Sequence, residues 1–303
     1  MVGFRMIALQ PPTVKVKSAG GYVGFMPSVL CIAGLDPSGY SGLSADFRAL
    51  QFLGVHCLPI ASTLTVQNSK AFTEHLPAPA EFIVRQLDTV LECETPGAIK
   101  LGMLGSHELA KILAEYLSDI RIPIITDPIF MTSTGASVID DEIMDAYIHD
   151  IFPVSHMVTP NAPEAEILTG LKADDPEMAE DVCNIIMDSG PGAVLLKGGH
   201  FKVSIGTDVF CDSSGCQIIP GKHIDVKVRG TGCAYSSLIA GNLSIGMDTL
   251  DAVRKAKLDM TLALSQAKVD GSPYLRFHTR SDVSSGKITN FGLNKHENSG
   301  GPE

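Results

Sequence analysis

The sequence contains few basic residues and no long apolar run, and both absences limit what the chain can do. Lysine and arginine number 23 against 34 aspartate and glutamate residues, so the formal net charge is −11. A negative overall charge argues against nucleic acid or an anionic membrane as a partner. No segment reaches the roughly 18 consecutive apolar residues by which a transmembrane helix is recognised. The apolar stretch near the start is too short for a secretory signal, so we expect a cytoplasmic protein.

The cysteines lack both a metal-binding pattern and an obvious pairing. Their number is odd, which fits poorly with a framework of disulfides, and no two of them have the spacing of a metal site. Most of them lie in apolar runs, where a buried free thiol is the usual state. We therefore take free thiols as the default for most of the seven cysteines, which are Cys31, Cys57, Cys93, Cys183, Cys211, Cys216 and Cys233.

What the chain does contain is a repeated alternation of short apolar strands and amphipathic helices. Its 303 residues are 45% hydrophobic, which is enough to bury one large core. This alternation is typical of an α/β fold with a mostly parallel central sheet and helices on both faces. Two short runs around residues 212–215 predict an antiparallel hairpin at one edge of the sheet. We expect a leader arm over residues 1–27, one domain over residues 28–276 and a polar tail over residues 277–303.

The pattern also predicts where the elements lie. Strands are expected at residues 29–35, 55–64, 98–104, 122–125, 157–159, 193–196, 207–211 and 217–219. Helices are expected at residues 41–54, 80–93, 107–120, 140–148, 162–169, 176–188 and 249–267, with a further helix directly after residues 230–233.

A glycine-flanked turn, Gly230-Thr231-Gly232-Cys233, precedes a run of small residues that suits a helix. Glycine lets a ligand approach the backbone closely, and the first N–H groups of a helix attract anions. We therefore predict a phosphate site at this turn. The thiol of Cys233 lies where the pKa is commonly lowered, which makes it a candidate proton acceptor. A helix cap with a buried cysteine would explain the same residues, because short glycine motifs are weak signals.

Polar residues recur where the predicted strands end. Ligands gather at the carboxyl ends of strands in open α/β sheets. Simpler explanations exist for each residue taken alone: Asn161 and Glu164 could cap a helix, and Asp127 could merely end a strand. Placement of all of them at one edge of one sheet favours a ligand site, with candidates Gly34, Asp46, Gln67, Met103, Asp127, Asn161, Glu164 and Lys197.

With these stretches combined, the chain resembles the ribokinase superfamily and, within it, the hydroxymethylpyrimidine/phosphomethylpyrimidine kinases of thiamine biosynthesis. The resemblance extends from about residue 29 to residue 267. Cys233 is its sharpest marker, because most sugar kinases of the superfamily have aspartate there. The matching motifs are Ala33-Gly34-x-Asp36-Pro37-Ser38-Gly39, Gln67-Asn68, Gly102-Met103-Leu104, Asp127-Pro128, Thr159-Pro160-Asn161-x-Pro163-Glu164-Ala165-Glu166, Lys197-Gly198-Gly199-His200 and Gly230-Thr231-Gly232-Cys233.

The resemblance implies a ribokinase-like three-layer sandwich that uses ATP and Mg²⁺ and forms a homodimer. It implies that Gly230, Gly232 and the amide of Cys233 form an anion hole, and that the Cys233 side chain accepts the substrate proton. Lys197 would neutralise phosphate charge, and Mg²⁺ would be held by Asp127, Asn161 and Glu164. The pyrimidine would be surrounded by Gly34, Asp46, Gln67, Met103 and Ile129.

The implied reaction is transfer of the γ-phosphoryl group of ATP to the hydroxymethyl group of 4-amino-5-hydroxymethyl-2-methylpyrimidine, with the monophosphate as a further candidate substrate. The chain departs from the family pattern at Tyr40 and Ser41, where glycines are usual, and at Ser133, where lysine is usual. Two alternatives therefore stay open. One is a pyridoxal kinase with the same phosphate machinery, and the other is a catalytically weak protein that senses a pyrimidine.

Overall fold

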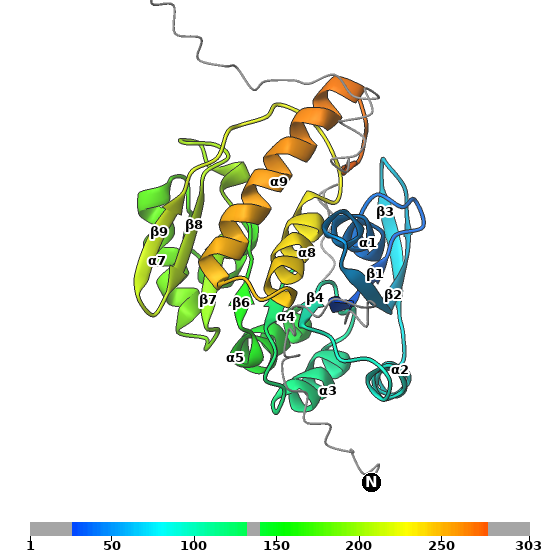
Figure 1. Ribbon diagram of the computed structural model, residues 1–303. Coiled ribbons are helices and arrows are strands. Elements are labelled where there is room, and N and C mark those ends of the chain that lie inside the picture. Colours follow the sequence, from blue (N-terminus) through cyan, green and yellow to red (C-terminus); the bar gives the residue numbers. More distant parts are fainter. Residues whose placement is uncertain (1–25, 132–139, 278–303) are drawn as a thin grey trace, which may run out of the picture.

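The computed structural model describes residues 26–131 and 140–277, which form one nine-stranded sheet between two layers of helices (Figure 1). The strand order is β3-β2-β1-β4-β5-β6-β7-β8-β9. Six neighbouring strands run parallel: β2 (His56–Gln67), β1 (Ser28–Leu35), β4 (Ala98–Leu101), β5 (Ile124–Thr126), β6 (Met157–Val158) and β7 (Ala193–Leu196). The predicted fold class is therefore confirmed.

Antiparallel strands close both edges of the sheet. At one edge β8 (Asp208–Asp212) and β9 (Gly215–Ile219) form the predicted hairpin against β7. At the other edge β3 (Phe72–Pro77) pairs with the end of β2, and the sequence pattern gave no sign of it. The reason is that β3 has no buried residue, so its sequence lacks the apolar run by which the inner strands are recognised.

Two hydrophobic cores lie on the two faces of the sheet, because successive strand residues point to opposite sides. In β1, Val29 and Cys31 belong to one core, whereas Leu30 and Ile32 belong to the other. The first core is covered by α1 (Gly42–Leu53), α8 (Thr231–Ser244) and α9 (Thr249–Asp270), which lie together in Figure 1. The second is covered by α2 (Ala80–Leu91), α3 (His107–Leu117), α4 (Asp141–Ala146), α5 (Phe152–Val154), α6 (Ala162–Thr169) and α7 (Pro176–Met187).

Local sequence signals account for many of the helix boundaries. In α2, Ile83, Leu87 and Leu91 recur every fourth residue and are buried, as an amphipathic helix requires. Gly54 ends α1 in the left-handed conformation. Helix α4 does not stop near residue 148 as predicted but continues through a π-helical turn, η1 (Tyr147–Ile151), into α5.

Helix α8 is the most buried helix, and all of its residues from Cys233 to Ser244 are buried. Its small residues allow α1 to approach closely: a side-chain carbon added at Gly241 would lie 2.6 Å from Leu53 Cδ1 of α1. The small-residue run after the glycine turn is therefore explained by close packing between α1 and α8.

The strand order marks a candidate ligand site at the carboxyl ends of the central strands. From β1 the chain moves to β2 on one side and later to β4 on the other, so the order reverses between β1 and β4. Parallel sheets bind ligands at such a point. Gly34 lies near the end of β1, Met103 and Asp127 lie in the loops that follow β4 and β5, and the N-terminus of α8 lies beside Asp127.

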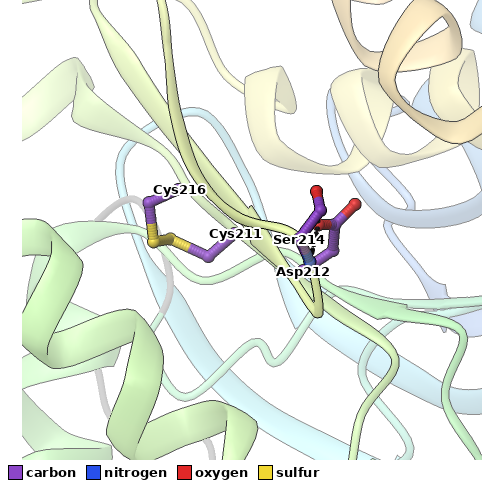
Figure 2. Close-up of a disulfide and its surroundings, with 4 residues drawn as sticks. All are labelled: Cys211, Asp212, Ser214 and Cys216. Atoms are coloured by element: carbon purple, nitrogen blue, oxygen red, sulfur yellow. Dashed lines mark hydrogen bonds between the residues drawn. A yellow bond between two sulfur atoms is a disulfide. The ribbon is translucent and has the colours of Figure 1, made fainter.

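The cysteines correct one expectation. Cys211 and Cys216 face each other across β8 and β9 and form a disulfide (Figure 2). The turn between them is stabilised by Asp212, whose carboxylate accepts hydrogen bonds from the amide and hydroxyl of Ser214. The prediction of free thiols was therefore wrong for this pair, because only the hairpin register brings the two cysteines together. The remaining cysteines, Cys31, Cys57, Cys93, Cys183 and Cys233, are free as expected.

Some predictions fall outside the described residues. The leader arm lies almost wholly in residues 1–25, and the tail lies in residues 278–303 apart from Phe277. Ser133 also lies in an undescribed stretch, residues 132–139. Within residues 26–131 and 140–277, no helix combines the length and apolar content that a membrane span requires.

Candidate active site

The predicted phosphate site is a tight turn that packs against charged residues from other strands. Gly230 begins α8 in the left-handed conformation with φ 77°, and a side-chain carbon there would lie 2.2 Å from the Tyr40 carbonyl oxygen. At Gly232 an added carbon would lie 3.4 Å from Lys197 Nζ and 3.6 Å from Asp127 Oδ2. Glycine is therefore required at Gly230, by its left-handed φ and by close approach, whereas a side-chain carbon at Gly232 would make only ordinary contacts. The free N–H groups of α8 start beside a lysine.

Lys197 lies between two buried carboxylates, and we call Lys197, Asp127 and Glu164 the phosphate-side cluster. Lys197 Nζ donates to Asp127 Oδ1 at 2.7 Å and lies 4.0 Å from Glu164 Oε2. Asp127 Oδ1 also accepts from the Thr159 hydroxyl at 3.2 Å. The Lys197 side chain is 12% exposed and that of Asp127 is 2% exposed, so this cluster is largely shielded from bulk water.

The electrostatics of the cluster follow from burial and close charge. Although burial opposes its ionisation, the Lys197 and Lys100 ammonium groups hold the pKa of Asp127 below its usual range. Burial raises the pKa of Glu164 to about 7, and the negative charge of Asp127 adds to this effect. Although burial favours a neutral amine, Asp127 and Glu164 raise the pKa of Lys197. At neutral pH the cluster therefore holds a cation, a carboxylate and a half-protonated carboxyl group.

Asn161 caps a helix in the structure. Its side-chain oxygen accepts from the Glu164 amide at 2.9 Å, while Glu164 Oε2 accepts from the Asn161 amide at 2.7 Å. This capping box starts α6, so the simpler explanation weighed from the sequence holds for Asn161. The Asn161 side chain therefore positions Glu164, and its role as a ligand of Mg²⁺ stays a prediction.

Asp127 and Glu164, the other two predicted ligands, could supply only a minority of the oxygen ligands of Mg²⁺. Among the residues that the structure describes, no group of three or more His, Cys, Asp or Glu side chains could hold a metal ion. Mg²⁺ commonly takes one or two carboxylates and completes its shell with water and substrate phosphates. Asp127 and Glu164 suit that role, since both are buried oxygen donors beside the predicted phosphate position.

The Cys233 thiol differs from the expectation for a helix N-terminus. Burial raises its pKa to about 11, and the Asp46 and Asp127 charges act in the same direction. Lys100 and the Gly42 amide oppose this increase. The expected lowered pKa was therefore wrong, because the Cys233 residue is only 7% exposed. A short sequence motif does not show how deeply a side chain is buried.

Asp46 also differs from its predicted role. Both of its carboxylate oxygens lie 3.1 Å from Lys100 Nζ, and Ser237 donates a hydroxyl hydrogen bond to it at 2.9 Å. The side chains of Asp46 and Lys100 are both 0% exposed. The carboxylate is thus already satisfied and shielded, so direct contact between Asp46 and a pyrimidine does not fit this structure. Sequence reasoning missed Lys100, although a lysine within the apolar run of β4 was a signal for a buried charge.

Three of the other predicted pyrimidine contacts lie at the strand ends. A carbon added at Gly34 would lie 3.5 Å from the sulfur of Met103, so these residues from β1 and the loop after β4 are neighbours. Ile129 is partly buried just beyond Asp127 and Pro128. Gly34 and Met103 are both buried.

Gln67 is joined to the glycine turn by an arginine that the sequence analysis did not identify. Arg229 Nη2 donates to Gln67 Oε1 at 2.8 Å, and Nη1 contacts the Asn68 carbonyl. Gln67 Nε2 donates to the Thr65 hydroxyl at 2.9 Å. Arg229 directly precedes Gly230, which was the available signal. Arg229 and Gln67 are 162 positions apart in the sequence, and their hydrogen bond places the Gln67 amide near the anion-binding turn.

Tyr40, one of the departures from the family pattern, packs against Tyr274. Its ring stacks on Tyr274 at 5.3 Å between centroids, and the Arg48 guanidinium lies 5.0 Å from the Tyr274 ring. Arg48 also donates to the carbonyls of Gly39 and Tyr40. The loop after β1 is thereby fixed against residues 272–276, while the Tyr40 carbonyl supports Gly230.

A helix N-terminus with free N–H groups, an adjacent lysine and two buried carboxylates are the parts that phosphoryl transfer requires. That reaction depends mainly on positioning and on stabilisation of charge. Set at the carboxyl ends of parallel strands, this arrangement is that of an α/β kinase.

Comparison with known proteins supports this class. The family model for phosphomethylpyrimidine kinase matches residues 36–273. A hydroxymethylpyrimidine/phosphomethylpyrimidine kinase of Rhizobium meliloti is 33% identical over 78% of this chain and 90% of its own. The crystal structure of phosphomethylpyrimidine kinase from Clostridium difficile is similar with a TM-score of 0.70 and 28% identity, over 78% of this chain and 99% of that chain.

A third similar structure is the pyridoxal kinase of Staphylococcus aureus in complex with AMP-PCP and pyridoxal. Its TM-score is 0.71 with 27% identity, over 80% of this chain and 88% of that chain. The chain belongs to the phosphomethylpyrimidine kinase family and is therefore a phosphotransferase. ATP as the phosphoryl donor agrees with the nucleotide analogue bound in that similar structure.

Proposed function

We propose that this kinase transfers the γ-phosphoryl group of ATP to 4-amino-5-hydroxymethyl-2-methylpyrimidine and then to the resulting monophosphate. The family membership gives the reaction and the substrate class. The observation that carries the assignment is the contact of Gly232 with the Lys197–Asp127 pair, which brings an anion hole, a cation and a carboxylate to one point.

The phosphate end of the site would work through backbone and charge. The first N–H groups of α8 face the transferring group, and Lys197 offsets part of its negative charge. Asp127 and Glu164 would hold Mg²⁺ together with phosphate oxygens and water. When bound, Mg²⁺ supplies further positive charge and a fixed geometry for the phosphates.

The pyrimidine end would be recognised by Gln67 between apolar walls. Gln67 Oε1 accepts from Arg229 and retains a second lone pair, and Nε2 donates to Thr65 and retains a second hydrogen. An aminopyrimidine edge offers the complementary N–H donor and ring-nitrogen acceptor. Gly34 and Met103 would contact the ring face, with Ile129 as a further apolar neighbour.

The chemical step moves one phosphoryl group and one proton. A bond forms between the hydroxymethyl oxygen and the γ-phosphorus, the bond from that phosphorus to the ADP oxygen breaks, and ADP leaves. The hydroxyl proton passes to the Cys233 thiolate. Because the thiol pKa is about 11 without ligands, this role depends on positive charge near the sulfur.

An ATP-depletion assay with three acceptors tests the proposal. We expect turnover with the hydroxymethylpyrimidine and with its monophosphate, and a kcat/KM for pyridoxal at least tenfold lower. A preference for pyridoxal would instead assign the chain to the activity that the Staphylococcus aureus protein's name describes. No turnover with any acceptor, together with pyrimidine binding by calorimetry, would support the sensor alternative.

Two further predictions rest on family resemblance. We propose that the protein is a homodimer and that it acts in the cytoplasm. Light scattering at micromolar concentration tests the first, and localisation of the tagged chain in cells tests the second.

A further inference from the structure

Below the catalytic turn lies a buried ion pair that the roles assigned so far do not use. The pair joins Lys100 of β4 to Asp46 of α1, and neither side chain is exposed. A buried lysine without exposure is costly unless it is closely paired, so its presence in β4 calls for a reason.

The pair belongs to a ladder of two contacts between α1 and α8. In the upper contact, the amide of Gly42, the first residue of α1, faces the Cys233 sulfur. One turn further along each helix, Ser237 of α8 donates to Asp46 of α1 at 2.9 Å. Residues four apart lie on the same helix face, so Gly42 lies above Asp46 and Cys233 lies above Ser237. Both helices therefore meet the ligand site with their positive ends.

Lys100 reaches this ladder from the sheet. Its Nζ lies 3.1 Å from both Asp46 oxygens, and a side-chain carbon added at Gly102 would lie 2.8 Å from the same nitrogen. The ammonium group of Lys100 thus lies against the backbone of Gly102, the residue before Met103. It holds Asp46, and through Asp46 and Ser237 it fixes α1 against α8 below the sulfur.

We propose that Lys100 is a positioning residue of this kinase: held by Asp46, its ammonium group supplies fixed positive charge beneath Cys233 and joins the helices whose N-termini form the site. The inference rests on the proposed function, because it assigns Lys100 a part in phosphoryl transfer. Negative charge develops near Cys233 when the substrate hydroxyl loses its proton, and a shielded cation stabilises it.

Charge on Cys233 provides the readout. Of the ionisable groups acting on this thiol, Lys100 lowers its pKa and Asp46 raises it. The other charged groups that interact with it are Asp127, Lys197 and Arg48. Removal of Lys100 and removal of Asp46 should therefore shift the pKa of the Cys233 thiol in opposite directions. A purely structural role of the pair would not produce opposite shifts.

The experiment compares Lys100→Met, Asp46→Asn and the double variant with the wild-type protein. The pH dependence of iodoacetamide modification at Cys233 is followed by peptide mass spectrometry, in parallel with kcat and KM. We expect the midpoint to move up by about one pH unit in Lys100→Met and down in Asp46→Asn. In the double variant, where no buried charge is unpaired, we expect kcat to fall on the order of tenfold to a hundredfold with both KM values within about twofold.

A control is Lys257→Met, which breaks a largely shielded lysine–aspartate pair elsewhere in the fold. Lys257 Nζ lies 2.6 Å from Asp208 Oδ2, and its loss should lower stability without moving the Cys233 midpoint. If Lys100→Met is too unstable to purify, the double variant and Asp46→Asn decide the outcome. A double variant with wild-type kcat would overturn the proposal, and so would an Asp46→Asn midpoint that does not move down. The modification assay needs no substrate, so it remains decisive even if the proposed acceptor is not phosphorylated by the wild-type protein.

Discussion

Two lysine–aspartate pairs lie near the catalytic turn, and they differ in access rather than in chemistry. Lys100 and Asp46 are both 0% exposed and lie 3.1 Å apart, whereas Lys197 is 12% exposed and lies 2.7 Å from Asp127. Asp46 is further satisfied by Ser237, while Lys197 has a second carboxylate, Glu164, at 4.0 Å. The sealed pair can act only through its field and its contacts, but the open pair can exchange partners when a phosphate arrives.

The largest expected effect is on stability and separates the two pairs. Lys100→Met leaves Asp46 buried without its cation, so the free energy of unfolding should fall by about 3–5 kcal/mol. Lys197→Met should lower the free energy of unfolding by less than half of that amount. The reason is that Lys197 is partly exposed and that Asp127 keeps its hydrogen bond from Thr159. Urea denaturation of both variants measures the difference. Equal losses would show that the difference in access has no energetic consequence.

The reverse order is expected for turnover. Lys197→Met removes the cation beside the anion hole, and kcat should fall on the order of 10²–10³-fold. The KM for the pyrimidine should change little, because Gln67 and the apolar walls are untouched. Steady-state kinetics over a Mg²⁺ titration check this, and unchanged turnover would remove Lys197 from the phosphate site.

Glu164 makes the open pair sensitive to pH. Its folded-state pKa is about 7 against an ordinary value of 4.5, so the folded protein binds a proton that the unfolded chain has released. Stability should therefore fall as pH rises from about 4.5 to about 7, by up to about 3 kcal/mol from this group. Denaturation at pH 5 and pH 8 should show a smaller difference in Glu164→Gln than in the wild type. An equal difference in both proteins would contradict the raised pKa.

Recognition of the ring should depend on Gln67 and on the arginine that holds it. Gln67→Leu leaves a ring hydrogen bond unmade, which costs roughly 1–3 kcal/mol, so the KM for the pyrimidine should rise about ten- to a hundredfold. Arg229→Met should raise the KM for the pyrimidine by a smaller factor, because the Gln67 amide loses its partner but is still present. The KM for ATP should stay within about twofold in both variants. An increase confined to ATP would mean that Gln67 does not contact the pyrimidine.

The smallest effect is expected at the disulfide of the edge hairpin. It closes a short loop, so its reduction should lower the free energy of unfolding by at most about 2 kcal/mol. Turnover should be unchanged, since β8 and β9 form an edge hairpin. Thiol counting before and after reduction, and kcat of Cys211→Ala/Cys216→Ala, test both statements. Loss of activity on reduction would indicate a link between this hairpin and the site.

Patterns within short stretches predicted a large part of this molecule. The bounds of α6 and β7 agree with those expected, and the glycine turn does begin a helix as predicted. Strand β3 was missed because its residues are not buried and leave no apolar run. The capping box at Asn161 was visible in the sequence as an alternative, but a helix cap and a metal ligand use the same residue types.

The sequence by itself determined the alternation of strands and helices, the glycines that a close turn needs, and the thiol at its end, because each depends on a few neighbouring residues. Only the tertiary structure decided that Lys100 pairs with Asp46, that Arg229 holds Gln67, and that Cys211 meets Cys216. These pairings depend on strand order, register and the angle between helices. Such features are set by packing of the whole chain, and no local stretch encodes them. The same holds for the pKa of Cys233, which burial by distant elements raises against the tendency of its own helix terminus.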